Sequence, residues 1–277
     1  MLTPFRRGSL RGTRAGPPTH SPSTVAARLA AAGCIAPDAE AGVLIAAAPD
    51  EVTLERWLGR RERGEPLAWI TGAAVFCGRR LSVAPGVYVP RRPTEELARR
   101  AARLVPTGGR VVDLCTGSGA VAASLTEMVP GVCVVGVDVD RLAARCARRN
   151  GVAVVVGDLD TPLRVHAAVD VVTAVPPYVP TRDLEHLPRD VLRYEPRAAL
   201  DGGVDGLDIV RRVVAAAARL LRAGGWLLVE VGGAQDGLLA PALVDGGFDD
   251  VESWYDEDGE LRGLLARRVR DASSPRV

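Results

Sequence analysis

The chain contains no lysine, so every basic side chain apart from its three histidines is an arginine. Its formal net charge of +1 provides no bulk field that would draw it toward nucleic acid or a membrane. The histidines, His20, His166 and His186, are scattered and match no zinc-ligand spacing, so we expect no metal site. Aromatic residues make up only 4% of the chain, and the tryptophans are too dispersed to form a base-stacking platform.

Cysteines and long apolar runs are sparse as well. The five cysteines are odd in number and form no Cys-x-x-Cys pair, which favours reduced thiols and a cytoplasmic location. No apolar run reaches the roughly 18 residues that a membrane span needs. Hydrophobic residues at 47% and charged residues at 25% are ordinary for a globular protein. The composition therefore excludes a disulfide scaffold and predicts no membrane span.

The length of 277 residues allows one or two domains. Residues 1–23 carry arginine, proline, glycine and serine but no acid, and we expect a disordered basic tail, with a basic arm or transit peptide as the alternative. Apolar residues at helical spacing predict a helical domain over 24–72, with Asp50 as an N-cap. Residues 73–90 alternate and predict a hairpin that bridges two domains, while 270–277 read as a tail.

From residue 91 to 269 the pattern alternates between strand and helix. Such alternation predicts a parallel, doubly wound α/β sheet of the Rossmann-like type, and an antiparallel pair over 248–268 completes seven strands. The five strands expected before that pair cover residues 110–116, 132–140, 152–159, 168–175 and 225–232.

A glycine turn follows the first of these strands. The stretch DLCTGSGA (113–120) reads as strand, tight turn and helix start, where glycine lets the backbone approach a ligand and the helix offers free N–H groups. Asp138 stands 21 positions after Gly117 and can accept both ribose hydroxyls of a nucleoside. Asp113 lies before the turn, where a carboxylate would repel a pyrophosphate but suits the ammonium of S-adenosylmethionine (SAM). The turn therefore indicates SAM rather than a nicotinamide cofactor.

The residues after the third strand complete the predicted cofactor site. Asp158 can bond the adenine amino group and Leu159 can flank its ring, whereas Cys115 is a small filler in the turn with nothing nearby to make a reactive thiolate. The full set of candidate cofactor-binding residues is Asp113, Cys115, Thr116, Gly117, Ser118, Gly119, Asp138, Asp158 and Leu159.

Several segments, in order along the chain, resemble one family. GEPLAWITG (64–72), DLCTGSGA, YEPRAALDGGVDGLDIVRR (194–212) and LLVEVGGAQ (227–235) are similar to segments of the bacterial protein-(glutamine-N(5)) methyltransferases, the HemK/PrmC family. The resemblance runs from about residue 25 to 268. It implies a class I SAM-dependent methyltransferase fold and transfer to a glutamine amide in a protein substrate, such as the Gly-Gly-Gln loop of a translation release factor.

The resemblance also implies a catalytic loop. The family carries Asn-Pro-Pro-Tyr after the fourth strand, and this chain reads Val175, Pro176, Pro177 and Tyr178 there. In the family, the Asn side chain and the first proline's carbonyl are thought to accept the two N–H bonds of the substrate amide, while the Tyr packs on its flat face. Such a loop catalyses by positioning the acceptor.

Val175 departs from the family pattern because it has no hydrogen-bond acceptor in its side chain. Three hypotheses follow: another acceptor that needs one hydrogen bond, replacement of the Asn by Thr173 on the same strand face, or SAM binding with little or no transfer. A second departure is RRP (91–93) where the family has Arg-Pro-Glu. An amino-methyltransferase on a small molecule or nucleic acid is a further alternative, although no basic stripe supports nucleic acid.

Overall fold

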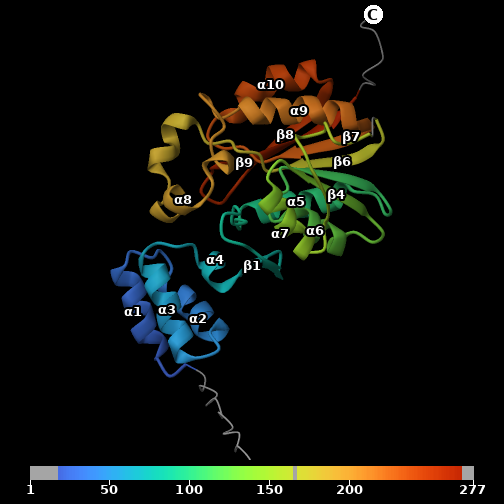
Figure 1. Ribbon diagram of the computed structural model, residues 1–277. Helices are drawn as coiled ribbons and strands as arrows, with labels where there is room; N and C mark the ends of the chain where they lie inside the picture. The colour runs from blue at the N-terminus through green and yellow to red at the C-terminus, as the bar shows by residue number, and fades with distance from the viewer. Residues whose placement is uncertain (1–17, 165–166, 270–277) are drawn as a thin grey trace, which may run out of the picture. The chain divides into compact units, whose positions relative to one another are not determined.

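The computed structural model describes residues 18–164 and 167–269 (Figure 1). It divides into two compact units, residues 1–71 and 72–277. The predicted tail 270–277 and most of the predicted tail 1–23 lie outside the described residues. Among the helices of the described part, none is long and apolar enough to cross a membrane.

The first unit is a small helical bundle. Its first helix begins at Pro22, two residues before the predicted domain boundary, because Ser21 caps it and proline suits the first helical turn. Asp50 is an N-cap as predicted, and its side chain accepts a hydrogen bond from the backbone N–H of Thr53 at 2.7 Å. The helices are α1 (Pro22–Ala31), α2 (Pro37–Ala47), α3 (Glu51–Glu62) and α4 (Leu67–Thr71). Their core consists mainly of Val25, Leu29, Leu44, Leu54, Leu58 and Ile70.

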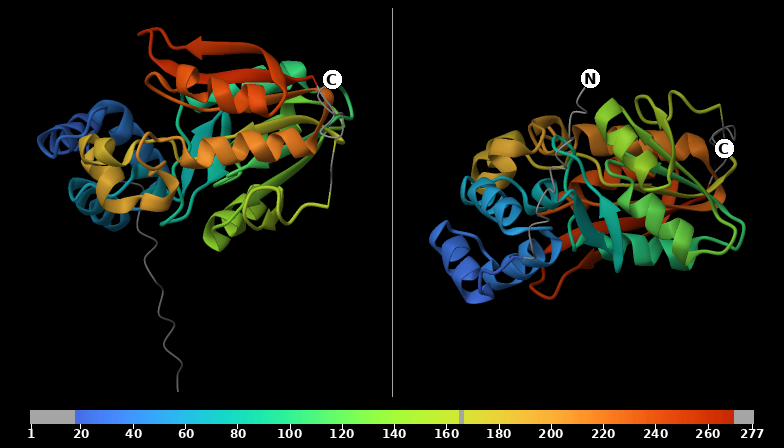
Figure 2. Two further views of the ribbon diagram at one scale, coloured as in Figure 1. Left: turned by 90° about the horizontal axis from the view of Figure 1, so that it is seen from above. Right: turned by 60° about the horizontal axis from the view of Figure 1, so that its bottom comes forward.

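The second unit is a seven-stranded sheet with a separate two-stranded hairpin (Figure 2). Its strands are β1 (Ala73–Phe76), β2 (Arg79–Ser82), β3 (Arg110–Leu114), β4 (Cys133–Asp138), β5 (Ala153–Val156), β6 (Val169–Ala174), β7 (Leu221–Val229), β8 (Phe248–Tyr255) and β9 (Leu261–Arg268). Its helices are α5 (Thr94–Leu104), α6 (Ala120–Met128), α7 (Arg141–Arg149), α8 (Arg189–Tyr194), α9 (Asp208–Leu220) and α10 (Gln235–Asp245), with two short 3-10 turns, η1 (Thr181–His186) and η2 (Arg197–Ala199).

The strand order is β5-β4-β3-β6-β7-β9-β8. Strands β3 to β7 run parallel, and the closing pair β8 and β9 is antiparallel, which confirms the predicted doubly wound α/β class. The order reverses between β3 and β6, since β4 and β5 extend the sheet on one side and β6 and β7 on the other. In such sheets ligands bind at the carboxyl ends of the strands at this reversal.

Helices cover both faces of the sheet (Figure 1). One face packs against α9 and α10 through alternate strand residues such as Val112, Val172 and Leu227. The other packs against α5, α6 and α7 through the intervening residues, among them Val111 and Leu228. Because side chains alternate along a strand, the polar residues that stand two positions after Val111 and Leu228 also lie on this second face. This face is therefore the one on which the site develops.

The hairpin is shorter than predicted. Strand β2 ends at Ser82, whereas the alternating pattern suggested strand character as far as residue 90. Pro85 has no N–H for a ladder and Gly86 takes a φ of 85°, so the chain leaves the hairpin here. The turn itself uses two left-handed residues, Cys77 and Gly78, as two-residue hairpins prefer.

The chain's single asparagine fastens the hairpin to the glycine turn. Asn150 accepts from the Ser82 N–H at 2.8 Å, and its amide group donates to the Ser82 carbonyl at 2.9 Å and the Ser118 carbonyl at 2.8 Å. Asn150 is buried, and Arg79 adds a bond from the hairpin to its carbonyl. One side chain thus joins β2 to the loop that precedes α6.

Asn150→Ala should lower the free energy of unfolding by about 2–4 kcal/mol, because three hydrogen bonds are lost. The Ser118 carbonyl and the Ser82 N–H lose their Asn150 partner, whereas the Ser82 carbonyl keeps its bond from the Cys146 thiol at 3.2 Å. Chemical denaturation followed by tryptophan fluorescence measures this. Arg80→Ala, an exposed change on the same hairpin, should cost no more than about 0.5 kcal/mol. Equal effects of the two substitutions would contradict the fastening role.

Candidate functional site

A cavity of about 450 Å³ lies at the carboxyl ends of the strands around the reversal point. A smaller pocket of about 40 Å³ adjoins it beside the glycine turn. Four residues, Tyr88, Cys115, Gly117 and Val175, line both spaces, so the two are parts of one site. The walls of the larger cavity are mostly apolar, with four carboxylates among the lining residues, those of Asp138, Asp140, Asp158 and Asp201. This is the composition expected of a small-molecule or cofactor site.

The glycine turn has the backbone shape that the sequence predicted. Strand β3 ends at Leu114 because Cys115 adopts a left-handed φ of 54°, and Gly117 and Gly119 follow at 56° and 78°. At Gly119 a β-carbon would come within 2.9 Å of Val152, so only glycine lets helix α6 begin here. The Cys115 thiol has a raised pKa because it is desolvated, so it stays protonated and fits the filler role predicted for it.

Asp113 is a buried carboxylate held by two hydroxyl groups. The Thr116 hydroxyl donates to it at 2.5 Å from the turn, and the Thr173 hydroxyl donates at 2.7 Å from the neighbouring strand β6. Burial raises the pKa of Asp113 from 3.8 to about 6, and the two hydroxyl bonds oppose that rise. Asp113 lines the smaller pocket together with Thr116 and Ser118. A cation in this pocket would meet a carboxylate whose orientation is already fixed.

Thr173 does not take the place of the missing asparagine. Its side chain is fully buried, and its hydroxyl donates to Asp113 rather than facing the larger cavity. The hypothesis that Thr173 bonds the acceptor is therefore wrong. Thr173 lies two residues before Val175, opposite Asp113 on β3, and its hydroxyl donates to the Asp113 carboxylate.

Asp138 connects the second strand to the glycine turn. One carboxylate oxygen accepts from the Gly117 N–H at 2.8 Å and the other from the Asp140 N–H at 2.8 Å. Burial raises its pKa, while these backbone bonds lower it. Each oxygen keeps a lone pair for a further donor, and Asp138 lines the larger cavity. Two hydroxyls on adjacent carbons are donors of the right kind for this position.

An ion pair lies among the residues that line the larger cavity. Asp158 accepts from the Arg212 guanidinium at 2.6 Å, and both side chains are about half exposed. Leu159 is buried with a left-handed φ of 48° and, with Val137 and Ile209, contributes an apolar wall. The structure thus places Asp158 and Leu159 together at the cavity, with the Asp158 carboxylate already engaged by Arg212.

The loop Val175–Tyr178 crosses the carboxyl end of β6. Val175 is partly buried and lines both spaces, and Pro177 lines the larger cavity. Pro176 is buried. The loop residues that line the two spaces are Val175 and Pro177, and neither side chain carries a hydrogen-bond acceptor.

Hydrogen bonds hold both the side chain and the backbone of Tyr178. Its hydroxyl donates to Glu230 at 3.0 Å, and its backbone carbonyl accepts from the Gln235 side chain at 2.8 Å. Gln235 also donates to the Asp205 carbonyl and accepts from the Gly232 N–H at 3.0 Å. One short segment after β7 therefore fixes both the side chain and the backbone of Tyr178.

The glycines of DGGVDG pack directly against the same loop. A β-carbon on Gly206 would lie 2.3 Å from the Tyr178 carbonyl, and one on Gly202 would lie 2.8 Å from the Pro177 carbonyl. Backbone bonds join the two segments, since the Gly202 N–H donates to the Val179 carbonyl at 2.9 Å. The glycine run is explained by this close approach of two backbones.

The segment before α5 is tied to the same region by a buried carboxylate. Glu195 accepts from the Arg91 guanidinium and from the Val89 N–H at 3.1 Å. Arg91 also lies over the Tyr88 ring, 5.1 Å from its centre, and burial raises the pKa of Tyr88 to about 12. Arg91 therefore keeps a defined partner in spite of the altered residues that follow it.

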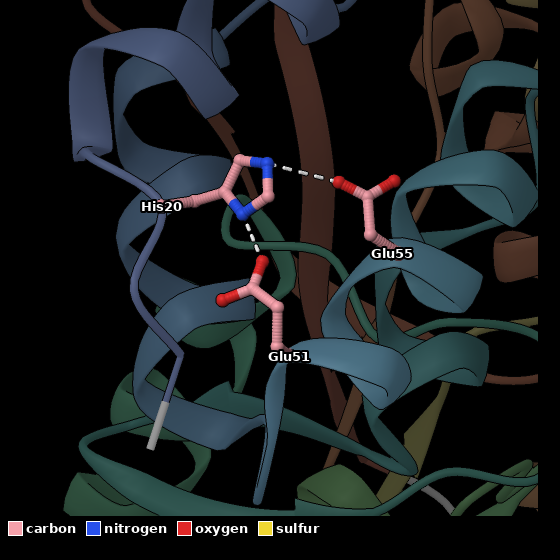
Figure 3. Close-up of side chains that lie close together, drawn as sticks. All are labelled: His20, Glu51 and Glu55. Atoms are coloured by element: carbon pink, nitrogen blue, oxygen red, sulfur yellow. Dashed lines mark ion pairs between the residues drawn. The ribbon is translucent and has the colours of Figure 1, made fainter. Parts of the chain in front are cut away.

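A separate cluster in the first unit brings His20 between Glu51 and Glu55 (Figure 3). The two ring nitrogens point at different carboxylates, one in contact with Glu51 and the other 3.0 Å from Glu55. Arg28 already donates to both oxygens of Glu55 at 2.7 and 2.9 Å. This arrangement is that of an ion-pair cluster, which fastens the residues before α1 to α3.

Comparisons with known proteins identify the fold of the second unit. A family model, Methionine biosynthesis protein MetW, matches residues 96–202. The solved structure of the T. thermophilus 16S rRNA N2 methyltransferase in complex with AdoMet and guanosine has a TM-score of 0.51 and 20% sequence identity, and the match covers 74% of this chain and 46% of that one. The second unit therefore has the fold of the class I SAM-dependent methyltransferases.

Sequence relatives define the family within that class. The release factor glutamine methyltransferase of Geobacter sulfurreducens is 41% identical over 218 residues, 76% of each chain. That of Mycolicibacterium smegmatis is 35% identical over 268 residues, 88% of this chain and 95% of the relative. The chain belongs to the release factor glutamine methyltransferase family, as its motifs predicted. A 4-amino-L-phenylalanine/4-methylamino-L-phenylalanine methyltransferase of Streptomyces pristinaespiralis is also 41% identical, over 65% of each chain.

The sequence did not predict the residues that hold the site residues in place. Glu230 and Gln235 were visible only as part of a late strand motif, and Thr94 only as part of the segment after RRP. Asn150 read as a helix end. Glu230 alone carries a sequence signal, a polar residue directly after an apolar strand, which indicates a buried partner but does not identify it. Thr94, Gln235 and Asn150 stand at helix ends, where polar residues are ordinary.

Thr173→Val should raise the pKa of Asp113 above about 6, because one of the two hydroxyl donors that stabilise the carboxylate is lost. A ¹³C NMR titration of the Asp113 carboxyl measures this, and Thr173→Ser should keep the native value. Since the folded pKa is raised above 3.8, this group's contribution to stability is fully present below that pH and is lost as the pH rises through about 6. An unchanged titration in Thr173→Val would contradict the bond.

Proposed function

We propose that this protein transfers the methyl group of SAM to the side-chain nitrogen of a glutamine in a protein, the Gly-Gly-Gln loop of a translation release factor. The single observation that carries the proposal is that the Pro-Pro-Tyr loop lies beside a glycine turn, with the Asp113 carboxylate at the end of β3 and the Asp138 carboxylate at the end of β4. Relatives named release factor glutamine methyltransferases that cover most of the chain support it.

The site residues fit SAM by their chemistry. Asp113 would face the ammonium of the methionine part, and Asp138 would accept from the ribose hydroxyls. Leu159, Val137 and Ile209 offer the apolar surface that adenine needs. The groups of the glycine turn, from Cys115 to Gly119, would pass close to the methionine part, and Asp158 would stay at the adenine end with Arg212.

SAM, when bound, supplies a methyl group on a sulfonium, which leaves by breaking its C–S bond as the new N–C bond forms. The electron pair of the broken bond stays on sulfur, and the nitrogen afterwards loses a proton to water. An amide nitrogen is a weak nucleophile, so the loop must act chiefly by holding it in line. Pro176 would offer its carbonyl to one N–H, and Tyr178 would contact the flat amide.

Val175 favours a second candidate acceptor, the primary amine of a small aromatic molecule. An arylamine nitrogen keeps more of its lone pair than an amide nitrogen and does not need two acceptors to orient it. Val175, with no acceptor, would provide an apolar contact for the aromatic ring or leave only one N–H bond to the loop. The relative named a 4-amino-L-phenylalanine methyltransferase supports this candidate.

The first experiment incubates the protein and SAM with a release factor carrying Gly-Gly-Gln, with 4-aminophenylalanine in a parallel reaction, and detects products by mass spectrometry. Methylated glutamine with the native protein supports the main proposal. Val175→Asn should raise release-factor methylation about 10- to 100-fold, since it supplies the missing acceptor.

Methylated arylamine without methylated glutamine would overturn the main proposal in favour of the second. Val175→Asn should then lower arylamine methylation. Val175→Leu, which is apolar but larger, separates the loss of space from the gain of an acceptor. If the protein binds SAM but methylates neither acceptor, the third hypothesis for Val175 holds, namely SAM binding with little or no transfer.

Asp138→Ala should weaken SAM binding about 10- to 100-fold, because it removes acceptors for two hydroxyl groups and the anchor of the Gly117 N–H. Isothermal titration calorimetry measures the dissociation constant. Asp249→Ala serves as the control, since this exposed carboxylate on β8 lies at the edge strand of the sheet. Unchanged binding in Asp138→Ala would exclude the ribose role.

A further inference from the structure

Glu230 is a buried acid at the carboxyl end of β7. Its side chain is 5% exposed, and its N–H donates to the Ala174 carbonyl at 3.0 Å, directly before the Pro-Pro-Tyr loop. Leu228, two residues earlier on the same face of the strand, packs in the apolar layer beneath α5 and α6. An apolar residue at position 230 would therefore continue that layer, and a carboxylate there needs a specific reason.

The groups around Glu230 come from four other segments of the chain. The Tyr178 hydroxyl donates to it at 3.0 Å from the loop after β6. The Thr94 hydroxyl, at the start of α5, lies close enough to lower its pKa. The guanidinium groups of Arg262 on β9 and Arg91 before α5 lower it further, while burial raises it as the largest effect. Several potential donors thus surround Glu230, and the Tyr178 hydroxyl is the one that makes a well-formed hydrogen bond to it.

We propose that Glu230 is a positioning residue, which holds the Tyr178 ring in the orientation required at the acceptor site. The inference rests on the proposed function only in naming Tyr178 as an acceptor contact. Without Glu230 the Tyr178 hydroxyl would lose its partner, and the ring could turn away while Gln235 still held the backbone carbonyl. The two bonds therefore have separate tasks, one on the backbone and one on the ring.

Glu230 also connects the acceptor loop to the cofactor end of the site. Thr94 lines the smaller pocket together with Asp113 and Thr116, and its hydroxyl is buried without a well-formed hydrogen bond among the described residues. A ligand group entering that pocket would meet Thr94, which neighbours Glu230, which in turn holds Tyr178. Glu230 therefore neighbours both Thr94 at the smaller pocket and Tyr178 in the acceptor loop.

The kinetic test uses Glu230→Ala, Glu230→Gln and Tyr178→Phe with the acceptor that the native protein methylates. Glu230→Ala should lower kcat about 10- to 100-fold, the cost of losing a hydrogen bond to a charged group. SAM affinity should stay within about threefold, so the loss is not one of cofactor binding. Glu230→Gln keeps the shape and an acceptor oxygen and should restore most of kcat, and Glu257→Ala in the exposed β8–β9 turn should change nothing.

A double-mutant cycle separates positioning from a general loss of packing. If both residues act through one bond, Glu230→Ala combined with Tyr178→Phe should be little worse than either alone. Multiplied effects of the two single variants, or an unchanged kcat in Glu230→Ala, would overturn the proposal.

An acceptor-free measurement keeps the proposal independent of the assigned function. With 3-fluorotyrosine in place of the four tyrosines, ¹⁹F NMR shows one resonance per ring, and Tyr178→Phe identifies the one at issue. We expect a single sharp Tyr178 resonance in the native protein and in Glu230→Gln, and a broadened or divided one in Glu230→Ala. A sharp, unshifted resonance in Glu230→Ala would overturn the positioning role even if methyl transfer to every tested acceptor failed.

Discussion

The bond between Thr173 and Asp113 joins the two strands between which the sheet reverses its order. Strands β3 and β6 remain paired there, with Asp113 opposite Thr173, but their connections lead to helices on opposite faces of the sheet, which leaves a gap at the carboxyl ends. A carboxylate placed in this gap is costly unless donors satisfy it. Thr173 from one strand and Thr116 from the turn provide them, so the gap becomes a pocket of fixed shape with one anionic wall. The glycine turn, the larger cavity and the acceptor loop are all arranged around that wall.

Side chains and backbone segments outside the acceptor loop hold it in place. Pro176 and Pro177 deprive it of ladder donors, so its conformation has to be fixed by side chains and by neighbouring backbone. Gln235 holds its carbonyl, Glu230 its tyrosine ring, and the glycines of 202–206 let a second backbone lie against it. Chemistry that depends on aligning a weak nucleophile requires such rigidity, because small displacements of the acceptor lower the rate strongly.

Local sequence features predicted the parts of the site that depend on local geometry. The turn from Asp113 to Gly119 is set by where glycine is required, and Asp138 by its distance along the chain, so both could be recognised without coordinates. The boundaries of β2 and β7 could not, since they depend on where Pro85 interrupts a ladder and on pairing with β6 and β9. The partners of Tyr178 are 52 and 57 residues away in sequence, and no periodicity joins them. Thr173 illustrates the same limit, because its face was predicted correctly but its partner was not.

Asn150 has a consequence for the chemical ageing of the protein. It precedes Gly151, and an asparagine followed by glycine is the sequence most open to spontaneous loss of the side-chain amide when the backbone can fold back on it. Here the amide is buried and bonded on both sides, and Gly151 is held in a left-handed turn at a φ of 83°. The hairpin and the glycine turn therefore protect the residue that joins them. Were the amide lost, an anionic oxygen would face the carbonyls of Ser82 and Ser118, and the damage would be felt at the cofactor site rather than at the hairpin alone.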